Sequence, residues 1–194
     1  GKWSFSLDTP AAGGPHTITM NDGERTVLKN ILMGEVWICS GQSNMEFPLR
    51  DATGAQADIA DSADPQLRFY DMKAIARTNT EQWPDSIIEA MDRLGHFKPT
   101  TWSAVGSGTA GDLSAVAYYF ARQLRDSLHV PVGIIGNAVG GAPCESWIDV
   151  TTLEHGMPEI LINWRTNDYV QPWAQGRANV NTGAAHPRSR HPYE

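Results

Sequence analysis

Apolar and polar residues alternate near the start of the chain. They do so at 3–7 (Trp-Ser-Phe-Ser-Leu) and at 16–20 (His-Thr-Ile-Thr-Met), which is the period of half-buried β-strands. The Asn-Asp-Gly sequence at 21–23 suits the positive φ of a tight hairpin turn. We therefore predict a small antiparallel sheet within roughly the first thirty residues.

Continuous apolar runs replace this alternation further along. Residues 35–39 and 132–137 are typical of parallel strands that are buried on both faces, and 67–70 is a third strand candidate. Between them, 113–128 has apolar residues at a 3.6-residue spacing, which predicts an amphipathic helix. Strand, helix and strand in this order predict an α/β domain, with a parallel sheet flanked by helices.

The other stretches carry weaker signals. Residues 51–64 are small and acidic and predict a short helix with loops, whereas 72–111 indicates long loops with short helical turns. A helix is predicted at 152–164, followed by a polar tail. We place the domain boundary after a β segment at 1–33, so that the α/β domain occupies 34–194.

Composition narrows the class of protein. Fifteen basic residues against 22 acidic ones give a formal net charge of −7, and such a surface repels phosphate backbones, so nucleic-acid binding is not expected. No apolar window approaches the ~18 residues of a transmembrane helix, so we expect no membrane span. Cys39 and Cys144 are too few for a disulfide framework and are not spaced for a metal. We expect buried free thiols, with a disulfide or a reactive thiol as the alternatives.

Two glycine-containing loops follow predicted strands, at the sheet edge where open parallel sheets bind ligands. The first, 40–45, carries Ser43 between the amide side chains of Gln42 and Asn44, and the second is 138–143. A serine hydroxyl surrounded by donors suits acyl transfer, because the hydroxyl attacks a carbonyl and the donors neutralise the oxyanion. The alternative is a polar loop that only caps the next helix.

The order of residues around this serine resembles one family of hydrolases. Met45 stands where the nucleophile elbow of the α/β-hydrolases requires glycine, which excludes that class. The stretch 41–45 (Gly-Gln-Ser-Asn-Met) instead resembles block I of the SGNH hydrolases, and 34–49 resembles the signature stretch of the sialate O-acetylesterase family. Further stretches similar to that family, in the family's order, are 1–4, 113–120, 130–136 and 140–148.

The resemblance implies a serine esterase that removes O-acetyl groups from sialic acid or a related acetylated sugar. The reaction would pass through an acyl-serine intermediate, without a metal or other cofactor. Ser43 would be the nucleophile and would donate one oxyanion-hole N–H, with Gly141, or else Gly140, as the second backbone donor. Gln42 and Asn44 are further candidates for oxyanion or substrate binding. The alternatives are an acetyl-xylan esterase of the same fold and a non-catalytic carbohydrate-binding or scaffold protein.

Two blocks of the family pattern are not found in this sequence: the amide-bearing block III and the late Asp-x-x-His block. The resemblance therefore implies the N-terminal half of an SGNH hydrolase domain, whose catalytic histidine and aspartate lie on the C-terminal half of the same protein. It also implies a secreted or periplasmic location, with a signal segment upstream of Gly1. We expect the isolated chain to hydrolyse aryl acetates barely, and to expose an unpaired strand edge and apolar surface.

For the remaining candidate residues, we prefer a structural role to a role in catalysis or substrate binding. The literal Asp-x-x-His at 126–129 closes the predicted helix, where a cation favours the helix C-terminus. We expect Glu46 and Glu145 to order loops rather than to bind substrate hydroxyls. The histidines expected at the surface are His16, His96, His155, His186 and His191. Three tryptophans could either pack within the fold or stack on sugar rings: Trp147, Trp164 and Trp173.

Overall fold

The computed structural model describes residues 4, 6–78, 80–93, 95–166 and 172–183. The chain divides into two compact units. Unit 1 comprises residues 1–38, 48–70 and 101–135, and unit 2 comprises 39–47, 71–100 and 136–194. The predicted domain boundary after residue 33 stays a prediction.

Unit 1 begins with an antiparallel hairpin of β1 (Gly13–Asn21) and β2 (Arg25–Met33). The turn between them is closed by the side chain of Asn21, whose Oδ1 accepts a hydrogen bond from the Gly23 N–H at 3.1 Å. Gly23 has a φ of 110°, which a residue with a Cβ adopts only with strain. The predicted antiparallel sheet and its turn are confirmed.

The predicted strand at 3–7 is wrong for its described residues. Residues 4 and 6–10 belong to no strand, and the partner of β1 follows the turn instead of preceding it. The physical reason is local: a tight turn brings its two flanks together at once, whereas pairing with 3–7 would require closing a longer proline- and glycine-containing loop.

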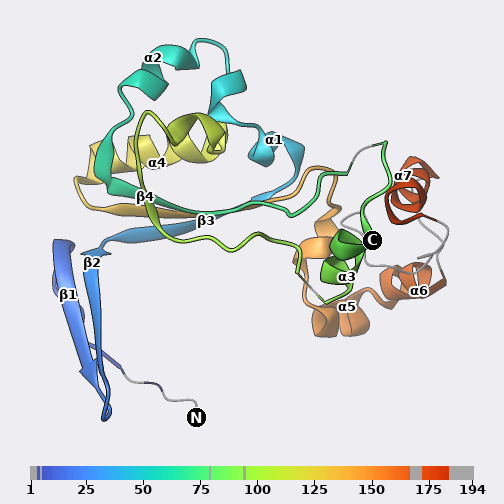
Figure 1. Cartoon of the computed structure of the whole chain (residues 1–194), viewed down its shortest axis with the longest axis horizontal. Coiled ribbons are helices and arrows are strands. Elements are labelled where there is room, and N and C mark those ends of the chain that lie inside the picture. Colours follow the sequence, from blue (N-terminus) through green and yellow to red (C-terminus); the bar gives the residue numbers. More distant parts are fainter. Residues whose placement is uncertain (1–3, 5, 79, 94, 167–171, 184–194) are drawn as a thin grey trace. The chain divides into compact units, whose positions relative to one another are not determined.

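A four-stranded sheet contains β3 (Glu35–Gly41), β6 (Val132–Ala138), β4 (Asp64–Met72) and β5 (Ser103–Val105), in that spatial order (Figure 1). β3 and β6 run in parallel. The Glu35 N–H donates to the Pro131 carbonyl where they begin, and the Val139 N–H donates to the Gly41 carbonyl where they end, both at 3.0 Å. β5 pairs with β4 in antiparallel fashion. The α/β class is therefore confirmed, with a mixed, mostly parallel sheet.

The predicted amphipathic helix is confirmed as α4 (Ala115–Leu128). The Ser114 hydroxyl caps it by accepting a hydrogen bond from the Ala117 N–H at 3.2 Å. His129 ends it in the left-handed conformation, with a φ of 56°. In unit 1, α4 and α2 (Ala55–Ala60) lie on the same side of the strands (Figure 1).

Several helical elements differ from the predictions. The helix predicted at 152–164 is two helices, α5 (Val150–Gly156) and α6 (Pro158–Thr166), because Pro158 has no N–H to continue the first. α7 (Pro172–Thr182) lies where a polar tail was predicted. The remaining helices are α1 (Ser43–Glu46), α3 (Asp85–Asp92) and the 3₁₀ turns η1 (Leu49–Asp51), η2 (Ala110–Asp112) and η3 (Cys144–Trp147).

Tertiary contacts explain why α7 escaped prediction. Its Asn181 is completely buried, and the amide of that side chain donates to the Glu81 carbonyl at 2.6 Å. The Asn181 carbonyl in turn accepts from the Trp83 N–H at 2.7 Å. Trp83 is packed in a small core of unit 2 with Ile88 and Met91 of α3. A helix held by a buried asparagine has no apolar periodicity for sequence reasoning to detect.

The prediction that β3 is buried on both faces is wrong for residues 35–38. Val36, Trp37 and Ile38 are exposed, and Cys39 is the one residue of this strand that is buried. Among the described residues, β3 pairs with β6 alone and is the edge of the sheet. A strand at an edge lacks the neighbours that would cover such a run.

Candidate active site

Ser43 lies immediately after the end of β3, in unit 2. Gly41 is the last residue of the strand and has a φ of 152°, and a Cβ there would lie 3.2 Å from the Cβ of Met45. The chain therefore turns sharply into the single turn of α1, which begins at Ser43. The Ser43 side chain is exposed, and its hydroxyl donates to Gln42 Oε1 at 3.0 Å. The turn thus presents this hydroxyl to solvent.

The glycine loop follows β6 in the same unit. The Ala142 N–H donates to the Val139 carbonyl at 3.1 Å, which closes a turn with Gly140 and Gly141 at its centre. Gly141 has a φ of 86°, the value that the third residue of a type II turn needs. The loop therefore depends on glycine at this position.

Two hydrogen bonds tie the serine loop to the glycine loop. The Val139 N–H donates to the Gly41 carbonyl at 3.0 Å, and the Gly140 N–H donates to Glu46 Oε2 at 2.9 Å. A Cβ on Gly140 would lie 2.5 Å from that same oxygen, so only glycine allows the carboxylate this close. The expectation that Glu46 orders a loop is confirmed.

The two candidate glycines differ in what their N–H groups do. The Gly140 N–H is already engaged by Glu46. In the described part of the chain, the Gly141 N–H has no acceptor. Of the two, Gly141 therefore has the backbone donor that is available to a ligand.

The remaining predicted site residues lie on the serine loop. Gln42 is the N-cap of α1, and its Oε1 accepts hydrogen bonds from the Ser43 N–H at 3.3 Å and from the Ser43 hydroxyl. Asn44 is exposed within α1. Thr78, which sequence reasoning missed, directs its hydroxyl to the Gly140 carbonyl at 3.5 Å. It lies in a stretch without periodicity, so nothing in the sequence indicated it.

No described histidine or carboxylate is hydrogen-bonded to the Ser43 hydroxyl. His129 closes α4 in unit 1, as expected, and Asp126 beside it is exposed. The His155 ring is exposed and bonds within α5, its Nδ1 lying 2.7 Å from the Thr151 carbonyl oxygen. His16 and His96 are half-buried rather than on the surface, whereas His186 and His191 lie outside the described residues.

Both cysteines are free thiols. Cys39 is buried in β3, as predicted, and burial raises the pKa of its thiol. Cys144 is exposed, so the prediction of a buried thiol is wrong there, because η3 leaves its side chain uncovered. No disulfide joins them in this structure.

Trp173 is exposed on α7, Trp147 is half-buried in η3, and the side chain of Trp164 lies outside the described residues. Glu145 is half-buried in η3. Over the ranges described, no cluster of three potential metal ligands occurs and no helix has the length and apolar character to cross a membrane.

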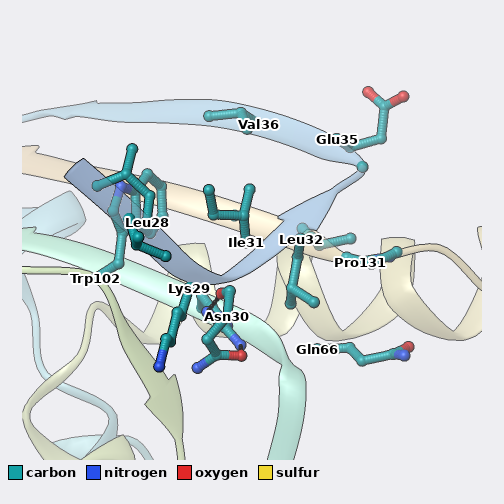
Figure 2. Close-up of a pocket in the computed structure, with 15 residues that line it drawn as sticks. Leu28, Lys29, Asn30, Ile31, Leu32, Glu35, Val36, Gln66, Trp102 and Pro131 are labelled. Atoms are coloured by element: carbon teal, nitrogen blue, oxygen red, sulfur yellow. Dashed lines mark hydrogen bonds between the residues drawn. The ribbon is translucent and has the colours of Figure 1, made fainter. Parts of the chain in front are cut away.

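A separate cavity of about 590 Å³ lies within unit 1, between β2 and the first residues of β3 and β6 (Figure 2). Arg68 of β4 donates to Asn30 twice, to its carbonyl and to its Oδ1, each at 2.8 Å. Asn30 has a φ of 60° at an irregular point of β2. Trp102 lies against Gly133, where a Cβ would be 3.1 Å from the indole. None of the predicted site residues lines this cavity.

The chain was compared with known proteins. No protein-family model matches it. It is 32% identical over 160 residues to sialate O-acetylesterase from Mus musculus, and 31% identical over 164 residues to the enzyme of that name from Homo sapiens, alignments that include 78% and 81% of this chain. This chain is a homologue of sialate O-acetylesterases. The predicted family resemblance is confirmed.

The fold of this chain also matches that of a solved carbohydrate acetylesterase. The crystal structure of a carbohydrate acetylesterase from Xanthomonas citri matches this chain with a TM-score of 0.63 and 31% sequence identity. The match includes 79% of this chain and 33% of the acetylesterase chain. The coverage of the relatives is partial: the chain spans 28% of the mouse protein and 30% of the human protein. It therefore corresponds to about three tenths of the curated relatives.

Proposed function

We propose that this chain supplies the nucleophile loop and an oxyanion loop of a carbohydrate O-acetylesterase whose substrate is sialic acid or a related acetylated sugar. One observation carries the proposal. The Gly41–Val139 and Gly140–Glu46 hydrogen bonds tie an exposed serine loop to a glycine turn that has a free backbone donor. Homology to carbohydrate acetylesterases supports the reaction class.

The chemistry requires the Ser43 hydroxyl to attack the acetyl carbonyl of the substrate. As the carbon becomes tetrahedral, the Gly141 N–H donates to the oxyanion, and the Ser43 N–H joins it by exchanging its hydrogen bond to Gln42 Oε1 for one to the oxyanion. Collapse of the intermediate breaks the ester bond, and the sugar oxygen leaves with a proton while the acetyl group stays on Ser43 Oγ. Water then attacks the acyl-serine and releases acetate. These steps are acyl transfer to a serine followed by hydrolysis.

A serine needs a general base to be an effective nucleophile. Gln42 Oε1 accepts the Ser43 proton in a hydrogen bond, but an amide oxygen is too weakly basic to remove it. Within the described residues no imidazole contacts this hydroxyl. We assign the base to polypeptide that corresponds to the remainder of the relatives, since this chain spans only three tenths of them.

The test uses a chimera in which this chain replaces the matching 160-residue stretch of mouse sialate O-acetylesterase. We expect it to release acetate from O-acetylated sialic acid, and a fluorophosphonate probe to label Ser43. The matched control is Ser43→Ala in the same chimera, which should lose both. Labelling that persists in Ser43→Ala would refute the nucleophile. A folded chimera that binds the sugar but releases no acetate would favour a non-catalytic binding protein, and preference for acetylated xylan would revise the substrate.

A further inference from the structure

The peptide group at the centre of the glycine turn carries the proposed oxyanion donor. This group joins Gly140 to Gly141, so the carbonyl of Gly140 and the N–H of Gly141 lie in one plane. The bond between them is trans. In a trans peptide the C=O and the N–H point in opposite directions. Whatever holds the carbonyl therefore fixes the direction of the N–H.

Thr78 contacts this carbonyl. Its hydroxyl donates to the Gly140 oxygen at 3.5 Å, from a segment 62 residues away in the sequence. Thr78 is half-buried and belongs to unit 2, as do the glycine turn and Ser43. The Gly141 N–H, on the opposite side of the same peptide group, has no acceptor in the described part of the chain. Thr78 thus holds the central peptide group by the side that faces away from the donor.

A turn with two glycines at its centre has two accessible forms. The third residue has a φ of about +80° in a type II turn and about −90° in a type I turn, and the two forms differ by roughly half a rotation of the central peptide group. Gly141, with a φ of 86°, is in the type II form. Glycine tolerates both signs of φ because it has no Cβ. The turn residues therefore do not exclude the type I form, in which the Gly141 N–H would point the opposite way.

Glu46 does not distinguish between these two forms. Its carboxylate accepts from the Gly140 N–H at 2.9 Å, and that N–H belongs to the preceding peptide group, between Val139 and Gly140. The Val139 carbonyl, which accepts from the Ala142 N–H at 3.1 Å, belongs to the same preceding group. Turns of both types form that second hydrogen bond. These contacts fix the place of the turn, whereas Thr78 contacts the group that rotates.

The core of unit 2 holds Thr78 in place. The indole N–H of Trp83 donates at 3.1 Å to the carbonyl of Arg77, on the peptide group that leads into Thr78. Trp83 is 5% exposed and packs with Ile88 and Met91. Because threonine is β-branched, its side chain has few rotamers once its backbone is fixed. The hydroxyl is therefore preorganised toward the glycine turn.

We propose that Thr78 is a positioning residue of the esterase, whose hydroxyl selects the type II form of the glycine turn and so keeps the Gly141 N–H available to the oxyanion. A hydrogen bond to the carbonyl also polarises the peptide group, which strengthens its N–H as a donor. This inference rests on the proposed function for the role of Gly141. The form of the turn that it assigns to Thr78, however, is observable without any activity.

The first test compares Thr78→Val with Thr78→Ser in the chimera. Valine keeps the shape of threonine without the hydroxyl, and serine keeps the hydroxyl. One hydrogen bond between neutral groups shifts an equilibrium by about 2- to 10-fold, so Thr78→Val should lower kcat for acetate release about 3- to 10-fold and leave KM unchanged. Thr78→Ser should retain most of the activity. An unchanged kcat in Thr78→Val, equal losses in the two variants or a change in KM alone would each overturn the proposal.

Thr80→Val is the matched control for this test. It makes the same substitution in the same segment, at a side chain that is exposed. We expect it to change neither kcat nor KM. A loss as large as that of Thr78→Val would mean that any hydroxyl removed from this segment disturbs the site, and it would refute the specific role of Thr78.

The second test observes the turn itself in the 194-residue chain. In a type II turn the α-hydrogens of Gly140 lie close to the amide hydrogen of Gly141, whereas in a type I turn the two amide hydrogens lie close together. Nuclear Overhauser effects distinguish the two forms. We expect the type II pattern in the unmodified chain and in Thr78→Ser, and a substantial type I pattern in Thr78→Val. A pure type II pattern in Thr78→Val would contradict the proposal, whether or not the chimera is active.

The two tests separate failure of this inference from failure of the proposed function. A chimera that releases no acetate and is not labelled at Ser43 would refute the esterase activity. If the turn still changed form in Thr78→Val, the selection of the type II form by Thr78 would nevertheless be supported. An active chimera in which the turn and kcat are indifferent to Thr78→Val would support the esterase and refute the positioning role.

Discussion

Glu46 and Gly140, which lie 94 residues apart in the sequence, are joined by a 2.9 Å hydrogen bond from the glycine N–H to the carboxylate. This contact links the loop that carries Ser43 to the turn that carries Gly141. It engages one glycine N–H and leaves the next without an acceptor among the described residues, so that Gly141 is the donor available to the proposed oxyanion hole. Glu46 is thus a positioning residue in the proposed site.

Replacing Glu46 with alanine should lower kcat of the chimera about 10- to 100-fold with little change in KM, because the glycine turn loses its anchor and the oxyanion donor moves. Glu46→Gln is the matched control, since its amide oxygen still accepts from Gly140, and it should retain most of the activity. Acetate release at varied substrate concentration measures both constants. Equal losses in the two variants would show that the charge, not the hydrogen bond, matters.

Gly140→Ala and Gly141→Ala should destabilise the chain for different reasons. The Cβ at position 140 would lie 2.5 Å from Glu46 Oε2, so the carboxylate would swing away and its hydrogen bond to the loop would be lost, at a cost of ~0.5–1.5 kcal/mol. At position 141 the φ of 86° is strained for alanine, at a cost of ~1–2 kcal/mol. Gly156→Ala is the control, because a Cβ there meets nothing within 4 Å. Urea unfolding compares the three, and a control as destabilised as the others would refute the explanation.

Arg68→Ala should lower the free energy of unfolding by ~0.5–1.5 kcal/mol, because the guanidinium holds Asn30 through two exposed hydrogen bonds of 2.8 Å. Asn30 has a positive φ, so its conformation depends on that support. Arg93→Ala is the matched control, since its side chain is 81% exposed and its contact with Glu89 is 3.9 Å long. Chemical denaturation of both variants measures the difference, and similar small changes would contradict the prediction.

Asp58 should contribute to the acid sensitivity of the fold. Hydrogen bonds from Tyr119 and Arg122 lower the pKa of its carboxyl in the folded state. A group whose folded pKa is depressed stabilises the fold above its unfolded pKa, about 3.9 for aspartate, and loses that contribution as the pH falls through the folded pKa.

The measurement is the melting temperature of the chain between about pH 6 and pH 2. Asp58→Asn should flatten the decline in melting temperature over the acid part of that range, and Tyr119→Phe should flatten it partly, because the hydroxyl of Tyr119 is the largest cause of the lowered pKa. An unchanged acid profile in Asp58→Asn would rule out this contribution.

The elements predicted from the sequence are those whose determinants are local. The turn at 21–23, the helix that Ser114 begins, and the strands that lead to the serine and glycine loops follow from residues that are close together in the chain. The proposed site also rests on local residues, because Ser43 and the two glycines were predicted from short stretches, and the comparisons with relatives extend along most of the chain.

The contacts that the sequence did not predict join distant residues. Thr78 reaches the Gly140 carbonyl across 62 residues, and Asn181 reaches the Glu81 carbonyl across 100. An exposed strand edge was predicted, but its position at Val36 and Ile38 was not, since an apolar run has the same pattern whether it is buried or exposed.

The sequence by itself determined the α/β class, the strand and the loop that carry Ser43, and the family of its relatives, because periodicity, turn residues and local motifs act over a few positions. Only the tertiary structure decided that Glu46 engages Gly140 and leaves Gly141 available, and that β3 is an edge. Those outcomes depend on which distant segments meet, which is determined by packing of the whole chain rather than by any local pattern.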